Sequence, residues 1–200
     1  VRGAGGFVGS ALGACGGSHT EEWDKGLVVT TTTKVPDFVR QGAGKYVDVY
    51  EVLKPNVDPH DYEPTPADVK ALHDADVIVK NGVHLESWFD DTIKNADSKA
   101  TIVDASHGVE LAHHDPHIWQ NPRNASVMVA NIAAALRRAD PSDATVLDAK
   151  AAAYQSLLTA LDRQTEAALA PIINRKVVTN HDAFGYYLRR YNLTLVGSVI

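Results

Sequence analysis

Short apolar runs alternate with stretches of helical periodicity from residue 27 onward, and this alternation constrains the fold more than any other feature. It is typical of an α/β domain with a parallel sheet. We expect strands at residues 27–33, 46–53, 76–80, 101–104, 176–179 and 193–200. We expect helices at residues 35–41, 85–93, 141–170 and 183–191. Two more are expected to begin near residues 65 and 121, one capped by Thr65 with Asp68 reaching back and the other capped by Asn121.

The helix at residues 141–170 exceeds the length of a normal domain helix. It can run without a break from the capping sequence Asp140-Pro141-Ser142-Asp143 to Pro171, which gives a rod of about 45 Å. Its broad polar face predicts a strut between two lobes rather than an element of one core. The expected apolar stripe consists of Leu147, Tyr154, Leu158, Leu161 and Ala168.

The expected long helix at residues 141–170 divides the chain into segments. We expect a leader and tether at residues 1–26, an α/β lobe at 27–140, the linking helix at 141–170 and the start of a second α/β lobe at 171–200. A single β-α-β unit cannot cover both faces of a sheet, so we expect the second lobe to be incomplete at Ile200. The expected fold class is α/β, with two Rossmann-like lobes that contain parallel sheets and are bridged by one long helix.

Charge and composition narrow the kinds of ligand. The formal net charge is −6, with 19 Lys and Arg scattered among 25 Asp and Glu, whereas nucleic-acid sites usually cluster basic residues. We therefore expect no nucleic-acid partner. Nine histidines accompany a single cysteine, so a metal site has to draw on imidazole and carboxylate ligands.

The single cysteine follows a short stretch of small and apolar residues at positions 3–14. The sequence Leu12-Gly13-Ala14-Cys15, followed by glycine and serine, resembles a bacterial lipoprotein signal. It predicts that Cys15 accepts a lipid that attaches the protein to a membrane. The alternative is a glycine-rich leader in which Cys15 has no function. No other segment approaches membrane-spanning length.

Three histidines lie in loops that follow apolar strands: His60, His117 and His181. Ligands of open α/β sheets bind outside the carboxyl ends of the strands, so three such loops can bring their imidazoles to one point. Proline precedes His60 and His117 and fixes the backbone there. The nearby aromatic residues Tyr62, Trp119 and Phe184 are candidates for walling such a site from water.

Four segments together carry a resemblance to a known family: DPHDYEPTP at 58–66, NGVHLESW at 81–88, DPHIWQNP at 115–122 and NHDAFGYYLRRY at 180–191. Over about residues 27–200 the chain is similar to the zinc and manganese ABC-transporter solute-binding proteins, the metal-binding lipoproteins of cluster A-I. The resemblance implies two α/β lobes bridged by one long helix, with the metal between the lobes.

In that family the metal ligands match His60, His117 and His181, and a fourth carboxylate, usually Asp, comes from the second lobe beyond Ile200. Manganese-type members carry a Glu at the third position, whereas three imidazoles suit Zn(II) better than Mn(II). The resemblance also implies a membrane permease with its ATPase as partner. We expect the protein to be a monomer. We expect it to be extracytoplasmic, either lipid-anchored to the outer face of the cytoplasmic membrane or periplasmic.

The remaining polar candidates have two interpretations each. Asp58, Asp115 and Asp182 either orient the neighbouring ligands or serve as turn and capping residues. His113 and His114 are candidates for an auxiliary metal contact beside His117. We expect His19, His73, His84 and His107 to be ordinary polar side chains, although His84 stands where the family has a small or apolar residue. Trp88 and Trp119 are expected to be core anchors.

Two other classes of function remain open. Three histidines and a water molecule would also suit a zinc hydrolase, but no HExxH segment is present, and Glu63 and Asp182 are the obvious nearby base candidates. A lipid-anchored surface adhesin is the third hypothesis, for which no residue specifies a partner. We expect a binding protein and not an enzyme.

Overall fold

A computed structural model describes residues 25–112 and 115–199 of the chain. The predicted lipid-attachment residue Cys15, along with His19, His113 and His114, lies outside the described residues. None of the helices in the described part combines the length and the apolar character needed to cross a membrane.

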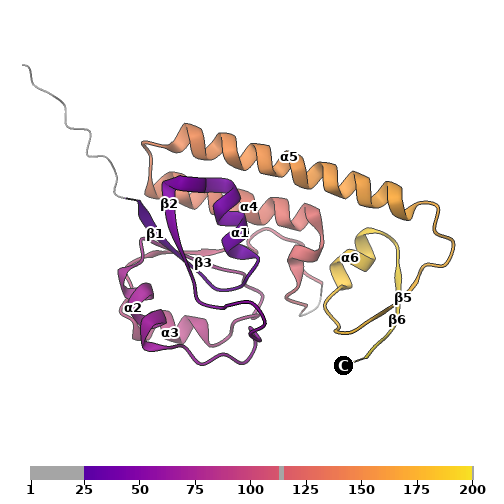
Figure 1. Cartoon of the computed structure of the whole chain (residues 1–200), viewed down its shortest axis with the longest axis horizontal. Helices are drawn as coiled ribbons and strands as arrows, with labels where there is room; N and C mark the ends of the chain where they lie inside the picture. The colour runs from indigo at the N-terminus through magenta and orange to yellow at the C-terminus, as the bar shows by residue number, and fades with distance from the viewer. Residues whose placement is uncertain (1–24, 113–114, 200) are drawn as a thin grey trace, which may run out of the picture.

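The first lobe, as we call residues 25–139, is built on a parallel sheet of four strands in the order β2-β1-β3-β4. The strands are β1 (Gly26–Thr30), β2 (Val47–Glu51), β3 (Val77–Lys80) and β4 (Thr101–Asp104). The helices are α1 (Val35–Ala43), α2 (Pro66–Asp74), α3 (Phe89–Asn95) and α4 (Pro122–Ala139), with short 3-10 turns at Gly44–Tyr46 and Ile118–Gln120. Figure 1 shows α2 and α3 on one face of the sheet and α1 and α4 on the other.

The second lobe, residues 171–199, contains the parallel pair β5 (Lys176–Thr179) and β6 (Thr194–Ser198), connected by α6 (Gly185–Arg190). The predicted fold class, α/β with parallel sheets and a long connecting helix, is therefore confirmed. The boundaries proposed for the leader, the lobes and the linking helix stay a prediction.

The long helix α5 (Ala144–Leu169) connects the lobes but also belongs to the first core. It lies along α4 and continues toward α6 (Figure 1). Leu147, Ala151 and Leu158 are buried in the same cluster as residues of the first sheet. The prediction of a strut that stands outside any core was therefore wrong for the first half of the helix, because its apolar positions lie against α1 and α4.

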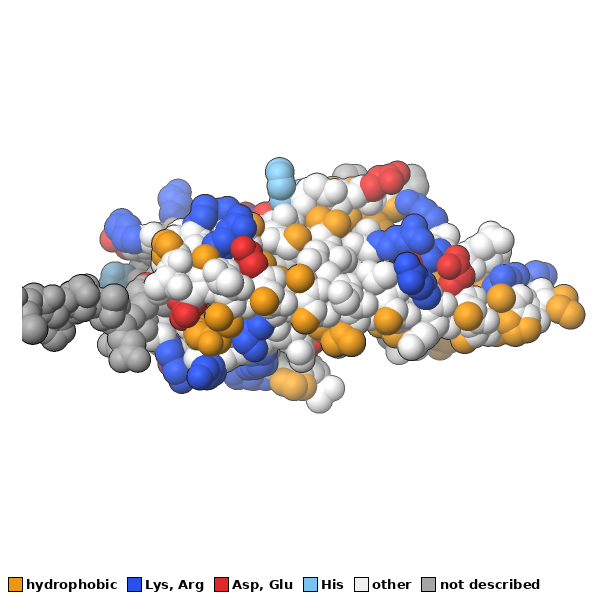
Figure 2. Space-filling model, turned by 90° about the horizontal axis from the view of Figure 1, so that it is seen from above, with side chains coloured by type: hydrophobic (Ala, Val, Ile, Leu, Met, Phe, Trp, Pro, Cys, Tyr) orange, Lys and Arg blue, Asp and Glu red, His pale blue; other side chains and the backbone are white. Residues whose placement is uncertain are grey.

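The predicted apolar stripe also fails toward the end of α5. Leu161 is 49% exposed and Ala168 is exposed, whereas Asp162 beside Leu161 is buried. Figure 2 looks down on the outer face of α5, where apolar side chains are interspersed with basic and acidic ones. At this end of α5 an acidic side chain is turned inward, where Asp162 accepts from Arg123 of α4 and Arg190 of α6.

Local sequence signals place several helix ends. Thr65 caps α2 and accepts from the backbone N–H of Asp68, whose carboxylate accepts the Thr65 N–H in return, as predicted. Asn121 caps α4, also as predicted. Helix α3 begins at Phe89 rather than at residue 85, because Gly82, Val83 and His84 have positive φ angles and form a turn. Strand β1 ends at Thr30 rather than at residue 33.

Candidate metal centre

His117 lies just before the turn that leads into α4, and its side chain is almost fully buried. The Asp115 Oδ1 atom accepts the backbone N–H of His117 at 2.9 Å and lies 2.7 Å from the ring Nδ1. Because an ionised carboxylate can only accept, Nδ1 is the donor in this contact, and in the neutral ring the lone pair available to a metal then lies on Nε2. Burial alone raises the pKa of Asp115, but the hydrogen bonds from His117 outweigh it and lower the pKa.

The second lobe brings His181 to that free nitrogen. The two Nε2 atoms, of His117 and His181, lie 3.4 Å apart, and the ring centroids lie 5.2 Å apart. Two nitrogen ligands of a tetrahedral zinc ion are about 3.4 Å apart and their ring centroids about 5.3 Å apart, for metal–nitrogen bonds of about 2.1 Å. The pair therefore has the spacing of two ligands of one ion.

His60 is the third imidazole of this cluster, and it is exposed. Its ring centroid lies 6.1 Å from that of His117, about 0.8 Å farther than the tetrahedral spacing. Within residues 25–112 and 115–199, no three His, Cys, Asp or Glu side chains surround one point closely enough to hold a metal. The structure thus gathers the three predicted histidines, with one pair at ligand spacing and His60 displaced outward.

The loop of His60 is fixed by contacts on both sides of the imidazole. Trp88 donates from its indole nitrogen to the Pro59 carbonyl at 2.9 Å. On the other side Tyr62 donates to the buried carboxylate of Asp68 at 2.9 Å. Burial and this hydrogen bond raise the pKa of Tyr62 to about 12, so its hydroxyl stays protonated and able to donate. Trp88 is half-buried and so acts as an anchor, as predicted.

The loop of His117 is held from the end of β3 by a buried polar cluster that sequence reasoning missed. Asn81 donates from its side chain to the Pro116 carbonyl at 3.0 Å. The Asn81 backbone N–H and the Thr31 hydroxyl both donate to Glu86 Oε1, at 2.5 and 2.7 Å. Burial raises the pKa of Glu86 in spite of these donors. The available signal was an acidic residue directly after Leu85 and close before the aromatic pair Trp88 and Phe89.

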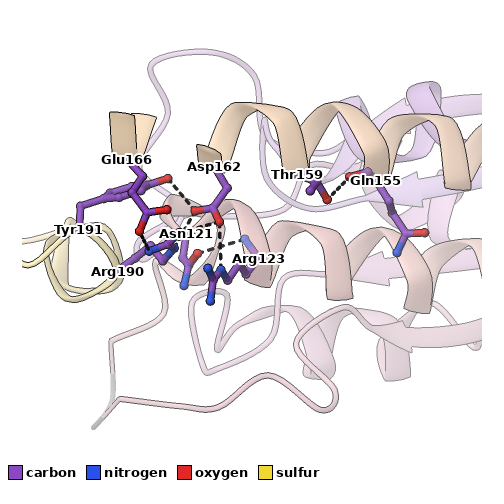
Figure 3. A network of polar contacts seen from close by, with 8 residues as sticks. All are labelled: Asn121, Arg123, Gln155, Thr159, Asp162, Glu166, Arg190 and Tyr191. Atoms are coloured by element: carbon purple, nitrogen blue, oxygen red, sulfur yellow. Dashed lines mark hydrogen bonds and ion pairs between the residues drawn. The ribbon is translucent and has the colours of Figure 1, made fainter. Parts of the chain in front are cut away.

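Asp162 on α5 joins the linking helix to both lobes (Figure 3). Arg190 donates from Nε and Nη2 to its two oxygens, each at 2.7 Å. Arg123 of α4 donates to Oδ2 at 3.0 Å, and the Tyr191 hydroxyl donates to Oδ1 at 3.1 Å. Burial alone raises the pKa of Asp162, but these hydrogen bonds outweigh burial and lower it. Arg123 follows the His117 loop in the chain, and Arg190 follows the His181 loop. The Asp162 carboxylate therefore connects the segments that carry these two histidines.

The other predicted candidates lie in different surroundings. Asp58 accepts the backbone N–H of His60 at 2.9 Å, which is a turn role, and Asp182 makes no hydrogen bond to His181 among the described residues. Trp119 packs edge-on against His117, with centroids 5.3 Å apart. Phe184 lies against Tyr187 rather than against an imidazole. His84 is exposed with a positive φ angle, and nothing in the structure explains it.

The family model described as zinc-uptake complex component A, periplasmic, matches residues 28–199. The chain belongs to this family. The family is one of substrate-binding receptors of ABC transporters and not of enzymes, which removes the support for the hydrolase hypothesis.

Individual relatives differ in the metal that their names give. The manganese ABC transporter substrate-binding lipoprotein PsaA of Streptococcus pneumoniae is 32% identical over 195 residues, which cover 89% of this chain and 63% of PsaA. The iron-binding protein YfeA of Yersinia pestis is 34% identical over 82% of this chain and 56% of YfeA. The chain thus spans less than two thirds of the length of these relatives.

Solved structures agree with the fold. The Zn(II)-bound ZnuA-like domain of Streptococcus pneumoniae AdcA superimposes with a TM-score of 0.82 at 30% identity, covering 88% of this chain and 68% of that one. The metal-dependent lipoprotein YcdH of Bacillus subtilis gives 0.82 at 32% identity, covering 86% and 67%. The identification as a metal-receptor family member made from the four sequence segments is confirmed.

Proposed function

We propose that this chain is the metal-capturing part of an extracytoplasmic receptor that delivers Zn(II) to an ABC-type membrane permease and its ATPase. One observation carries the proposal: His117 and His181, on different lobes, present their Nε2 atoms to each other at 3.4 Å. Two imidazole nitrogens at this distance form at most a weak hydrogen bond with each other, but their spacing is that of two ligands of one cation. A site between two lobes also suits capture and release, because a small lobe movement changes its ligand set.

The remaining ligands complete the proposed cage. An inward shift of about 0.8 Å brings the His60 ring to the tetrahedral spacing from His117. Its imidazole is exposed, so the side chain can rotate inward on a loop that Trp88 and Tyr62 hold in place, whereas the His117 ring is held by Asp115. We propose a carboxylate outside residues 1–200 as the fourth ligand, in keeping with the family resemblance. Such a closed site has no open position for a reacting water, unlike a catalytic zinc site.

Growth and uptake test the receptor role. A bacterium that lacks the intact protein is expected to take up zinc more slowly at limiting zinc, and added zinc is expected to restore its growth. Uptake of radioactive zinc measures the effect, with reintroduction of the wild-type gene as control. Equal uptake by the deletion strain, in medium where no other zinc importer is expressed, contradicts the proposal.

The donor set supports zinc over manganese. Three imidazoles are softer ligands than carboxylates, and Mn(II) prefers carboxylate and water oxygen. The relatives named above bind manganese, iron or zinc by their names, so the family alone leaves the metal open. Position 181 supports the zinc type, because this chain has His181 where manganese-type members carry Glu.

Replacing His181 by glutamate is expected to move the preference toward Mn(II). The variant exchanges one nitrogen ligand for an oxygen of a harder carboxylate. We expect the ratio of the Mn(II) to the Zn(II) dissociation constant to fall by about tenfold or more, a one-ligand effect at least as large as loss of a supporting residue. Competition titrations of the stripped intact protein measure both constants. An unchanged ratio would place the selectivity elsewhere.

The proposed location of the receptor rests on the leader at residues 1–26. We propose that Cys15 is lipidated and holds the receptor, as a monomer, at the outer face of the cytoplasmic membrane. PsaA and other relatives are described as lipoproteins. Incorporation of a labelled fatty acid that disappears in Cys15→Ser tests this part. Retention of the label in that variant would contradict it.

A further inference from the structure

The first turn of α6 touches the loop that carries His117. Tyr186 is 3% exposed, and its hydroxyl accepts the Ala112 N–H at 3.0 Å and donates to the Asp115 carbonyl at 3.1 Å. A hydroxyl that is used both as donor and as acceptor in a buried place is sensitive to the position of both partners. One side chain of the second lobe therefore holds the backbone of the first lobe on either side of residues 113–114.

Gly185 brings the backbone of the second lobe even closer to the same loop. A Cβ atom at position 185 would lie 2.6 Å from Asp115 Oδ2, which is too close for any real contact. The other oxygen of that carboxylate, Oδ1, is the one that lies 2.7 Å from the His117 ring. The start of α6 thus rests directly on the group that orients His117.

The segment just before this turn carries the second ligand. His181 lies four residues before Gly185, and its carbonyl accepts the Ala183 N–H at 2.9 Å. The path from one imidazole to the other runs from His117 through Asp115 to Gly185 and Tyr186, and back along five residues of backbone to His181. These contacts connect the backbone of one imidazole to that of the other.

We propose that Tyr186 is a positioning residue that sets the spacing of His117 and His181 before the metal arrives. The inference rests on the proposed function, since it assumes that these imidazoles are ligands. Ordering two loops on separate lobes costs conformational entropy, and a contact that has already ordered them removes that cost from binding. The hydroxyl serves this purpose, while the ring packs in the first core with Ile118 and its neighbours.

Tyr186→Phe separates the two roles, because phenylalanine keeps the ring and removes the hydroxyl. We expect the zinc dissociation constant to rise about three- to tenfold, the effect of losing one to two net hydrogen bonds. Tyr187→Phe is the matched control: Tyr187 is the next residue on the same helix, and its hydroxyl makes no hydrogen bond within the described part of the chain. Its dissociation constant is expected to stay within about twofold of wild type.

The measurement uses the intact protein, stripped of metal and titrated with zinc against a chelator of known affinity. The unfolding midpoints of the metal-free and zinc-loaded forms are recorded for each variant. A positioning role predicts that the increment in midpoint on zinc loading shrinks in Tyr186→Phe, because linkage ties that increment to affinity. A packing role alone lowers both midpoints equally and leaves the dissociation constant unchanged, and this result overturns the inference.

Gly185→Ala gives a second, independent variant. Its added methyl displaces the Asp115 carboxylate while the Tyr186 hydroxyl stays, so zinc binding is expected to weaken here as well. Wild-type affinity in Tyr186→Phe overturns the inference, whatever the result for Gly185→Ala, but leaves the proposed function intact. Failure of the proposed function has a different signature: wild-type protein that does not bind zinc, or His181→Ala that binds it as tightly as wild type.

Discussion

Replacing His117 by alanine is expected to weaken zinc binding by more than about 100-fold. Loss of a residue that only supports a zinc ligand costs about 10- to 100-fold in affinity, and His117 is the central ligand of the proposed cage. Its ring neighbours both of the other imidazoles, since its centroid lies 6.1 Å from that of His60 and 5.2 Å from that of His181. Titration of the stripped intact protein against a zinc chelator measures the loss.

His107→Ala is the matched control for this experiment. His107 is an exposed histidine on the loop after β4, outside the cluster, so its removal is expected to leave the zinc affinity unchanged. Comparing the two variants also removes the effect of losing one of nine histidines, since both lose one. A dissociation constant for His117→Ala within about threefold of wild type would be incompatible with a metal site at these residues.

Features that depend on neighbours in sequence could be predicted. The alternation of apolar runs and helical periods indicated the parallel sheet, since its central strands β1 and β3 are buried on both faces and have apolar sequences. The ends of α2 and α4 followed from Thr65 and Asn121, because an N-cap acts over two or three residues. The four segments with their histidines also placed the three imidazoles in loops that the structure brings together.

Contacts between residues far apart in sequence could not be predicted. Tyr186 meets Ala112 across 74 positions, and Asn81 meets Pro116 across 35. Neither pair leaves a periodic signal, because each partner satisfies a single backbone group of a loop. Asp162 was missed for a related reason: on a helix with a broad polar face, one more acidic residue predicts solvent exposure. Its burial depends on two arginines, Arg123 and Arg190, that come from other helices.

Replacing Asp162 by asparagine is expected to lower the free energy of unfolding by about 3 kcal/mol, the lower end of the cost of breaking a buried ion pair. Asparagine keeps the shape but turns an N–H donor toward arginines that can only donate. Arg190, whose side chain is 10% exposed, then retains a charge without its main partner. For a chain of this size the thermal midpoint is expected to fall by roughly 6–12 °C. Calorimetry of the metal-free intact protein at pH 7 measures it.

The pH dependence separates the charge of Asp162 from its packing. Since the folded-state pKa of Asp162 is lowered, its contribution to stability is complete above the unfolded value of 3.8 and is lost as pH falls through the folded value. The difference in midpoint between wild type and Asp162→Asn is therefore expected to shrink below about pH 3.8. Glu166→Gln is the control, because among the described residues the Glu166 carboxylate pairs with Arg190 alone. Its side chain is 59% exposed, so the effect is expected to be small. A deficit in Asp162→Asn that is equal at pH 7 and pH 3 would mean that the contacts around this carboxylate act through shape rather than charge.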